Sequence, residues 1–396
     1  MKKWISFGDI NKYLFYPFVG GMVKLLLELI LDKIDAEFFS HPLIKGVNAG
    51  FGMSLSFIPF LITIIRTKKL NAISSNIAVY ANEKLEGRKK IIQGKFALLF
   101  ICAFLDFLQK YLSFNIIHDQ NNNVWIFDLI FFVAFSMFIL NEKLYRHQYL
   151  SLILIIIVLL ISIFWYDYSN IKEKIYDFLL VLYIEFVYSI NHVLNKYLME
   201  TKFCNPYEIS FYEGIFALII NIILLSIISN IEIPKYSGVL KVFKHKNYDG
   251  KIYIDNFKYY MDKFSAKEFF VFLLVAFNRV SYNLFSLLTI KHFTPSHVII
   301  ILLFGEMEYG FETVMRGDVA FTFFFFLILF FLILVFTEVI ELNFFGISSN
   351  TKKNIRERAA KMEESNSRNY SFQGEKVEMD GVIIDMADED SEEKTL

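Results

Sequence analysis

Cysteine, excess charge of either sign and a cleavable leader are all scarce or missing in this chain of 396 residues. The two cysteines, Cys102 and Cys204, lie in or beside apolar stretches, so a disulfide framework is not expected. The 40 Lys and Arg residues against 41 Asp and Glu leave a formal net charge of −1, which argues against a nucleic-acid-binding field. The first eleven residues lack the pattern of a secretory signal, and none is expected.

Motifs that carry catalysis are also missing. The sequence has no Gly-x-Ser-x-Gly, no His-Glu-x-x-His and no Gly-x-x-x-x-Gly-Lys, which argues against a serine hydrolase, a zinc protease and an ATP-driven pump. We recognise in the sequence no repeated motif of the kind that forms the selectivity filter of a channel. We therefore expect no enzymatic activity, no cofactor and no metal. Five of the histidines fall at the edges of apolar stretches, without metal-ligand spacing: His41, His118, His147, His292 and His297.

Long apolar stretches dominate the chain, whose mean hydropathy is +0.44. Residues 321–336 consist almost wholly of Phe, Leu and Ile, without the polar stripe of a helix on a soluble core. The pattern predicts an all-α membrane protein with ten transmembrane helices, each long enough for a hydrocarbon core of about 30 Å. The predicted spans are 12–31, 43–66, 95–116, 124–141, 147–166, 174–197, 207–229, 267–290, 296–315 and 318–342.

The charged segments predict the orientation. The loop 67–94 carries six Lys and Arg residues, which favours a cytoplasmic location, and an even number of spans then places both termini in the cytoplasm. The polar insert 230–266 is also rich in Lys and opposes this assignment, but more segments support it than oppose it. The acidic tail 346–396 lacks apolar periodicity and is predicted to be a disordered cytoplasmic segment.

Two helix starts match each other and indicate a duplication. A proline is followed eight residues later by a glycine in both, at Pro42 with Gly50 and at Pro206 with Gly214. The breaks before the fifth and tenth spans also correspond. Because five spans per half is an odd number, the halves 1–166 and 167–345 would insert with opposite orientations. Such inverted five-helix repeats are the usual architecture of secondary transporters.

Several motifs resemble the drug/metabolite transporter superfamily, and most closely its nucleotide-sugar-transporter-like branch, solute carrier family 35. The start of the fourth span, 123–128, departs from that family because it lacks a basic substrate motif. The resemblance implies a ten-helix carrier. The motifs are Leu194-Asn195-Lys196-Tyr197, Asn205-Pro206-Tyr207-Glu208, Phe211-Tyr212-Glu213-Gly214, His41-Pro42 through Gly52, Asn141-Glu142-Lys143-Leu144 and Gln148-Tyr149-Leu150.

Polar side chains inside the spans mark candidate sites, because a charge at the bilayer centre costs about 2.5–3.5 kcal/mol. The third and eighth spans are equivalent in the two halves and would meet across a central site. Their cations could bind an anion and their amides polar groups, although interhelical hydrogen bonding is an equally weighted alternative. The predicted substrate-binding residues are Asp106, Gln109, Lys110, Asn278, Arg279 and Asn283.

Acidic residues and a histidine form a second candidate set. A histidine beside a carboxylate can carry a proton near neutral pH, and a purely structural role in helix contacts is the alternative. Lys24 and Glu28, four residues apart, are predicted to pair on one helix face, and Asp128 is predicted at the membrane interface. The residues considered for proton coupling are Glu185, His192, Glu306 and Glu308.

These observations predict an integral, multi-pass protein of an endomembrane that moves a small polar metabolite by alternating access. An anion such as a nucleotide sugar is one candidate substrate class, and other organic solutes remain open. The expected partners are the lipid bilayer and a small-molecule substrate, with no nucleic acid and with a homodimer left open. The alternative from a different class is a membrane scaffold or receptor that transports nothing.

Overall fold

The computed structural model describes residues 5–7, 12–32, 42–73, 94–114, 127–165, 171–228, 245–246, 252–253, 264–304, 319–342, 358 and 361. The chain divides into two units, Met1–Ser348 and Ser349–Leu396. Arg358 and Lys361 are the described residues of the second unit, and all packing discussed below lies within the first.

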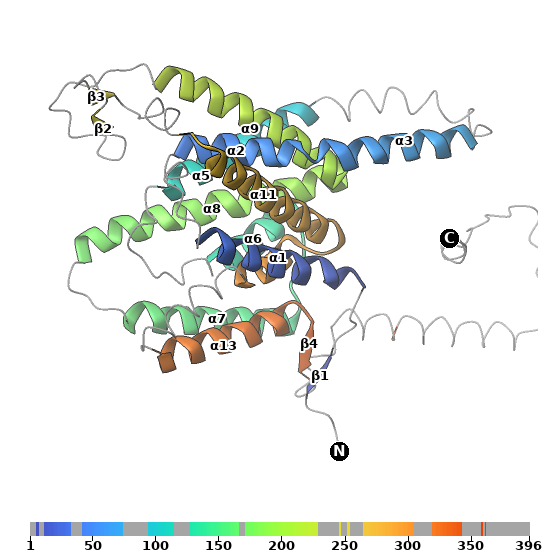
Figure 1. The fold of residues 1–396 in the computed structure, drawn as a ribbon. Coiled ribbons are helices and arrows are strands. Elements are labelled where there is room, and N and C mark those ends of the chain that lie inside the picture. Colours follow the sequence, from blue (N-terminus) through green and yellow to red (C-terminus); the bar gives the residue numbers. More distant parts are fainter. Residues whose placement is uncertain are drawn as a thin grey trace, which may run out of the picture. The chain divides into compact units, whose positions relative to one another are not determined.

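Helices make up most of the described part of the first unit, and they begin where long apolar stretches predicted them (Figure 1). The coarse prediction of a helical protein is therefore confirmed. Residues 299–304 continue the helix η6. In chain order, the helices are η1 (Lys12–Leu14), α1 (Phe15–Asp32), α2 (Pro42–Ser54), α3 (Phe57–Ile73), α5 (Lys95–Phe114), α6 (Phe127–Ile139), α7 (Arg146–Trp165), α8 (Ile171–Thr201), α9 (Pro206–Ile228), α11 (Ala266–His292), η6 (Pro295–Val298) and α13 (Val319–Phe336).

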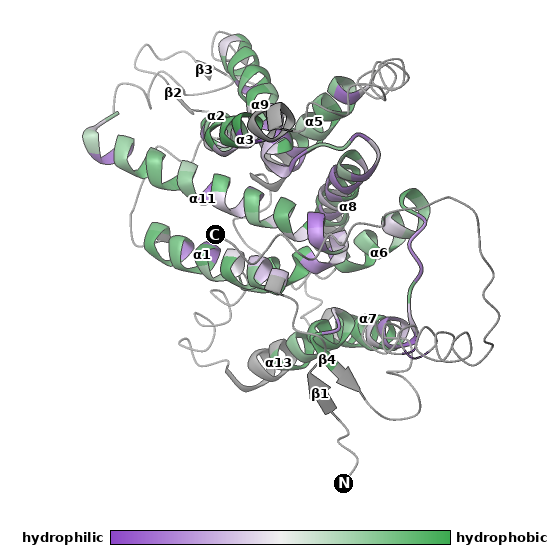
Figure 2. Cartoon of the chain, turned by 90° about the vertical axis from the view of Figure 1, so that its right-hand side faces the viewer, coloured by the Kyte–Doolittle hydropathy of each residue, from purple (hydrophilic) through white to green (hydrophobic). Residues whose placement is uncertain are grey.

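Three helical stretches in the described ranges are long and apolar enough to cross a membrane, namely Leu43–Arg66, Pro206–Ile227 and Ala266–His292. Hydrophobic residues cover most of α1, α9 and α11 in Figure 2. Large apolar side chains stand on the outside of these helices, as Ile222 and Ile223 of α9 do at 51% and 53% exposure. Such a face suits a hydrocarbon solvent better than water. These stretches support a membrane protein, whereas the ten crossings stay a prediction.

The predicted span 43–66 consists of two helices. Helix α2 ends at Ser54 and α3 begins at Phe57. The hydroxyls of Ser54 and Ser56 each donate to the carbonyl three residues earlier, at 2.7 and 2.5 Å. Pro59, in the first turn of α3, has no backbone N–H to continue the helical ladder. Competing side-chain hydrogen bonds and a missing donor together explain the break.

Helices α2 and α9 cross closely, with one glycine from each at the crossing. A Cβ atom on Gly50 would stand 2.8 Å from the nitrogen of Leu218 and 3.0 Å from the oxygen of Gly214. Farther along, the side chain of Asn221 fills the space beside Gly46. Residue numbers rise along α2 as they fall along α9, so the two helices run antiparallel. The absence of a Cβ allows the two backbones to touch.

Two further helices flank this crossing. Helix α5 packs against both α8 and α9, and α11 packs against both α1 and α2. The rings of Phe100 and Phe216 lie 5.7 Å apart between α5 and α9, and those of Phe51 and Phe272 lie 5.6 Å apart between α2 and α11. These contacts gather the predicted third and eighth spans around α2 and α9.

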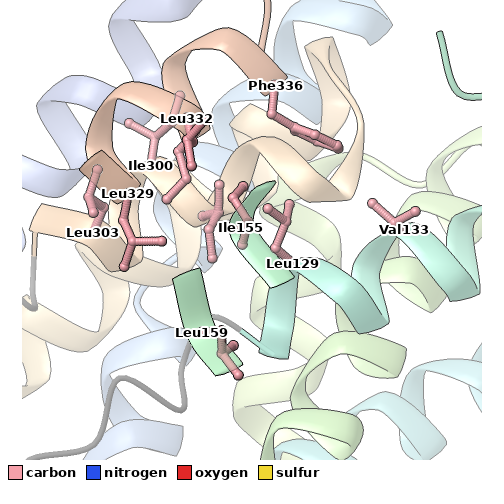
Figure 3. Close-up of a cluster of buried hydrophobic side chains, with 11 residues drawn as sticks. Leu129, Val133, Ile155, Leu159, Ile300, Leu303, Leu329, Leu332 and Phe336 are labelled. Carbon is pink, nitrogen blue, oxygen red and sulfur yellow. The ribbon is translucent and has the colours of Figure 1, made fainter. Parts of the chain in front are cut away.

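A hydrophobic core joins α6, α7, α13 and the helix that follows η6 (Figure 3). Ile155 of α7 and Leu329 and Ile333 of α13 are fully buried there. The side-chain amide of Gln148 donates to the carbonyl of Phe336 at 3.5 Å, at one end of the pair. Helices α7 and α13, which lie in the predicted fifth and tenth spans, thus pair through apolar side chains.

Two short strand pairs were not predicted. Strand β1 (Ile5–Phe7) pairs antiparallel with β4 (Ile340–Leu342), and within the polar insert β2 (His245–Lys246) pairs with β3 (Ile252–Tyr253). Runs of two or three residues are too short to show the two-residue alternation that identifies a strand. Pairing between distant ends of the sequence therefore left no local signal.

Several helices end in a left-handed residue. Among the described residues other than glycine, positive φ angles occur at Asn141 (54°), Phe203 (51°) and Glu338 (62°). The end of α8 closes with a hydrogen bond from the nitrogen of Cys204 to the oxygen of Leu198, at 3.2 Å. Glycine or asparagine usually occupies such a position, because a larger side chain crowds its own carbonyl. Phe203 is therefore under backbone strain.

Replacing Phe203 with glycine is expected to stabilise the fold by about 1 kcal/mol, since the left-handed conformation costs other residues roughly 1–2 kcal/mol. Little packing is lost, because the Phe203 side chain is 76% exposed. Thermal unfolding of the purified protein in detergent measures the change. Phe203→Ala is the matched control, because alanine keeps the Cβ; equal stabilisation by both variants would contradict the strain.

Candidate functional site

Helix α11 carries three of the predicted substrate-binding residues. Asn278 is buried at 8% exposure, and its Oδ1 accepts no hydrogen bond from the described part of the chain. Asn283 donates through Nδ2 to the hydroxyl of Ser210 on α9, at 3.1 Å. The side chain of Arg279 is exposed. Helix α11 therefore carries one buried and one half-buried amide at its helix contacts, whereas Arg279 is exposed.

Helix α5 carries the other three predicted binding residues. Asp106 and Gln109 are half-buried. Lys110 lies in the helical backbone of α5, and its side chain lies outside the described residues. Asp106 interacts electrostatically with His192 of α8. Two predicted site residues, one on α5 and one on α8, thus lie within electrostatic range of each other.

A carboxyl pair joins α6 to α8. Asp128 is 1% exposed and thus buried within the protein, while its place at the membrane interface stays a prediction. The hydroxyl of Ser189 donates to Oδ1 of Asp128 at 3.0 Å. Glu185, one helical turn before Ser189, forms a hydrogen bond with the same carboxyl group. Two carboxyl groups can share a hydrogen bond only if one of them keeps its proton.

His192 packs among aromatic rings rather than beside Glu185. Its ring centroid lies 4.3 Å from that of Tyr188 and 5.8 Å from that of Phe132. The hydroxyl of Tyr188 in turn hydrogen-bonds the hydroxyl of Tyr282 on α11. This tyrosine pair could not be predicted from the sequence, because aromatic residues occur throughout the spans. Glu306 and Glu308, also considered for proton coupling, lie outside the described residues.

The predicted pairing of Lys24 with Glu28 is confirmed, with Nζ 3.9 Å from Oε1. The same ammonium lies 5.4 Å from the ring centre of Tyr282, in the range of a cation–π contact. Helix α1 thereby places a partly neutralised cation near the tyrosine pair of α8 and α11.

The residues predicted for binding and proton coupling do not include three buried polar residues. Asn191 and Asn195 of α8 are 6% and 1% exposed, and Glu213 of α9 is 2% exposed. Asp106 and Glu213 both interact electrostatically with the buried Cys102 of α5. The four-residue spacing of Asn191 and Asn195 could have indicated a shared face. Ala49 precedes the first of the two matched glycines, whereas Glu213 precedes the second, and this difference could also have singled out Glu213.

Metal binding finds no support in the described ranges, where no three side chains of His, Cys, Asp or Glu gather as ligands. Cys102 and Cys204 are both free and buried. The polar groups at the contacts of α5, α8, α9 and α11 can therefore donate, accept and carry charge, and we call them the polar layer: Asp106, Asn191, His192, Asn195, Ser210, Glu213, Asn278 and Asn283.

Cys204, in the turn between α8 and α9, should alkylate slowly. Burial raises the pKa of its thiol to about 11, and the thiolate is the nucleophile. We expect slow modification by N-ethylmaleimide at pH 7 and faster modification toward pH 10, followed by mass spectrometry of the cysteine-bearing peptide. Phe203→Cys in a Cys204→Ser background is the exposed control. Similar rates for the two positions at pH 7 would contradict the burial.

No protein-family model matches the chain, and no curated protein matches it. Functional inference therefore rests on the residues and their contacts.

Proposed function

We propose that the chain is a multi-pass membrane carrier that moves a small polar organic solute by alternating access. Its ten predicted spans form two inverted five-helix repeats, 1–166 and 167–345, and 346–396 is a cytoplasmic tail. Rocking of the two halves about a central site opens that site to either side of the membrane. No cofactor takes part, and transport is either passive exchange or proton-coupled.

The observation that carries this proposal is the crossing of α2 with α9. Gly50 and Gly214 are the equivalent glycines of the two matched helix starts, and the backbone of each lies against that of the other. Equivalent positions contact each other where a two-fold axis passes between two copies of a unit. The antiparallel course of α2 and α9 is the course that an inverted repeat requires.

Other helix contacts also occur in equivalent pairs. Helix α5 packs on α9 as α11 packs on α2, and α8 packs on α5 as α1 packs on α11. Phe100 precedes Asp106 by six residues and contacts Phe216, whereas Phe272 precedes Asn278 by six and contacts Phe51. The recurrence of both helix and ring contacts supports two copies of one packing unit.

The polar layer lies beside this crossing, on the helices that a carrier uses to hold its substrate. Buried polar side chains within membrane spans are costly and commonly mark a transport path. Asn278 and Asp106 occupy equivalent positions in the two halves, and both belong to the layer. The layer therefore supports a solute site between the repeats.

Reconstitution of the full-length protein into liposomes tests the proposal. Counterflow of radiolabelled solutes should exceed that of protein-free liposomes for at least one member of a panel of nucleotide sugars, amino acids, organic cations and organic anions. The control is the same protein heat-denatured before reconstitution. If correctly folded protein moves no member of the panel, the carrier proposal fails and a scaffold or receptor role takes its place.

A further inference from the structure

The carboxyl groups of Asp128 and Glu185 join the two predicted halves of the chain. Asp128 lies on α6 in the first half, Glu185 lies on α8 in the second, and the two side chains share a hydrogen bond. Carboxylates accept hydrogen bonds but donate none, so this bond requires one proton. Helices α6 and α8 also pack against each other. The proton thus supports a contact between two helices that the predicted repeats assign to opposite halves.

The two members of the pair differ in their access to the surroundings. Asp128 is 1% exposed, and the hydroxyl of Ser189 donates to its Oδ1 at 3.0 Å. Glu185 is half-buried, so its carboxyl group lies at the edge of this helix contact. Ionisable side chains within membrane spans commonly belong to proton relays or ion paths. A proton can enter and leave the pair through Glu185, while Asp128 is held in place by Ser189.

A cation and two tyrosines surround the pair. Lys24 interacts electrostatically with Glu185, and its ammonium lies 5.4 Å from the ring centre of Tyr282. The hydroxyls of Tyr188 and Tyr282 form a hydrogen bond, and both tyrosines interact electrostatically with Asp128. These contacts bring α1, α6, α8 and α11 together at one site. A cation at this site can balance a negative charge that a departing proton leaves behind.

Further titratable groups lie on the helices around the site. Glu28 of α1 lies 3.9 Å from the ammonium of Lys24. His192 of α8 interacts electrostatically with Asp106 of α5. Nδ1 of His297, on η6, is hydrogen-bonded to a threonine hydroxyl of the same turn at 2.9 Å. The experiments therefore change the carboxyl pair alone and keep these groups in place.

We propose that Asp128 and Glu185 are the proton-binding site of the carrier, and that the solute moves together with, or in exchange for, the proton that they share. This inference rests on the proposed carrier function and names its coupling ion. With the proton bound, the hydrogen bond holds α6 against α8. After the proton leaves to water through Glu185, two carboxylates face each other and repel, so the contact between the halves loosens. Because proton binding favours one arrangement of the halves, it can drive their rocking.

Infrared difference spectroscopy of the full-length protein in detergent detects the shared proton without a solute. The carbonyl stretch of a protonated carboxyl group should be present near pH 7 and decrease toward pH 10. Asp128→Asn and Glu185→Gln should each remove the intensity of about one carboxyl group, because the amide N–H replaces the proton as the donor. Glu200→Gln, whose side chain is 52% exposed, is the matched control and should leave the band unchanged.

Two isosteric variants are used so that a folding defect in one leaves the other as a test. Loss of the band in a folded variant supports the shared proton. An unchanged band in both folded variants would overturn the inference, and so would equal loss in the Glu200→Gln control.

Proteoliposomes with an imposed pH gradient test the coupling. The solute is the one that counterflow identifies, and potassium with valinomycin clamps the electrical potential. One direction of the gradient should raise accumulation over that at equal pH, by up to about tenfold per proton for one pH unit. Asp128→Asn and Glu185→Gln should bring this ratio to about one, whereas Glu200→Gln should keep it. Equal accumulation under both gradient directions in the wild type would overturn the coupling.

Failure of the proton site is distinguishable from failure of the carrier function. Counterflow that responds to neither direction of the pH gradient would overturn the proton coupling and keep the carrier. A carboxyl band that the two isosteric variants remove, without counterflow of any solute, would keep the shared proton and overturn the carrier.

Discussion

Gly214→Leu is expected to abolish folded, monodisperse protein, and Gly214→Ala to lower the free energy of unfolding by about 1–3 kcal/mol. A Cβ atom at Gly214 would lie 2.5 Å from the nitrogen of Ser54 and 2.8 Å from the oxygen of Gly50. Both are backbone atoms, so no side-chain rotation relieves the clash and the two helices must separate. Size-exclusion profiles in detergent and melting curves measure the loss.

Two control variants show whether the loss of stability at Gly214 comes from the backbone contact or from a general sensitivity of the fold to substitution. A Cβ on Gly21 of α1 would meet the Phe304 side chain, which can move, so Gly21→Ala should cost less than Gly214→Ala. Ile223→Ala, on the exposed face of α9, should cost least in detergent. Equal stability of wild type and Gly214→Ala would contradict the close crossing and remove the main support for the two-fold arrangement.

The matched helix starts could be read from the sequence because proline fixes where a helix begins and glycine marks where backbones approach. Helices α2 and α9 do begin at Pro42 and Pro206. Length and apolar content likewise predicted the other helices, since a continuous apolar run of this length favours one structure in a membrane. These signals are local in the sequence, so they can be recognised without knowledge of the tertiary structure.

The orientation of each helix about its own axis could not be predicted in the same way. Helix α13 is apolar on every side, so no polar stripe shows which face packs on α7. The same lack of pattern hid the burial of Asp128 and the exposure of Arg279. Which polar residues share a site depends on these rotations, and they follow from packing between distant segments. Asp106 is half-buried and Asn278 is buried, and their predicted meeting across a central site and their role in binding stay predictions.

Asp128→Ala is expected to lower the free energy of unfolding by about 1–3 kcal/mol, because it removes the hydrogen-bond partner of the Glu185 carboxyl group. The Glu185 carboxyl would lose the group that shares its hydrogen bond, whereas the Ser189 hydroxyl would lose Oδ1 of Asp128 but keep the backbone oxygen of that residue as an acceptor, at 3.2 Å. Asp128→Asn should cost less, since an amide can accept from Ser189 and donate to Glu185. Denaturant titration of the protein in mixed micelles measures both variants.

A double-mutant cycle decides whether Asp128 and Glu185 act as one unit. Asp128→Leu and Glu185→Leu each leave one carboxyl group without its carboxyl partner. The double variant removes both carboxyl groups and places two apolar side chains there instead. The double variant should therefore be more stable than the sum of the single losses predicts, by about 0.5–3 kcal/mol of coupling. Ser189→Ala in each background shows how much of that coupling passes through the hydroxyl. Additive losses within about 0.5 kcal/mol would mean that the two carboxyl groups act independently, and the shared proton between α6 and α8 would have to be abandoned.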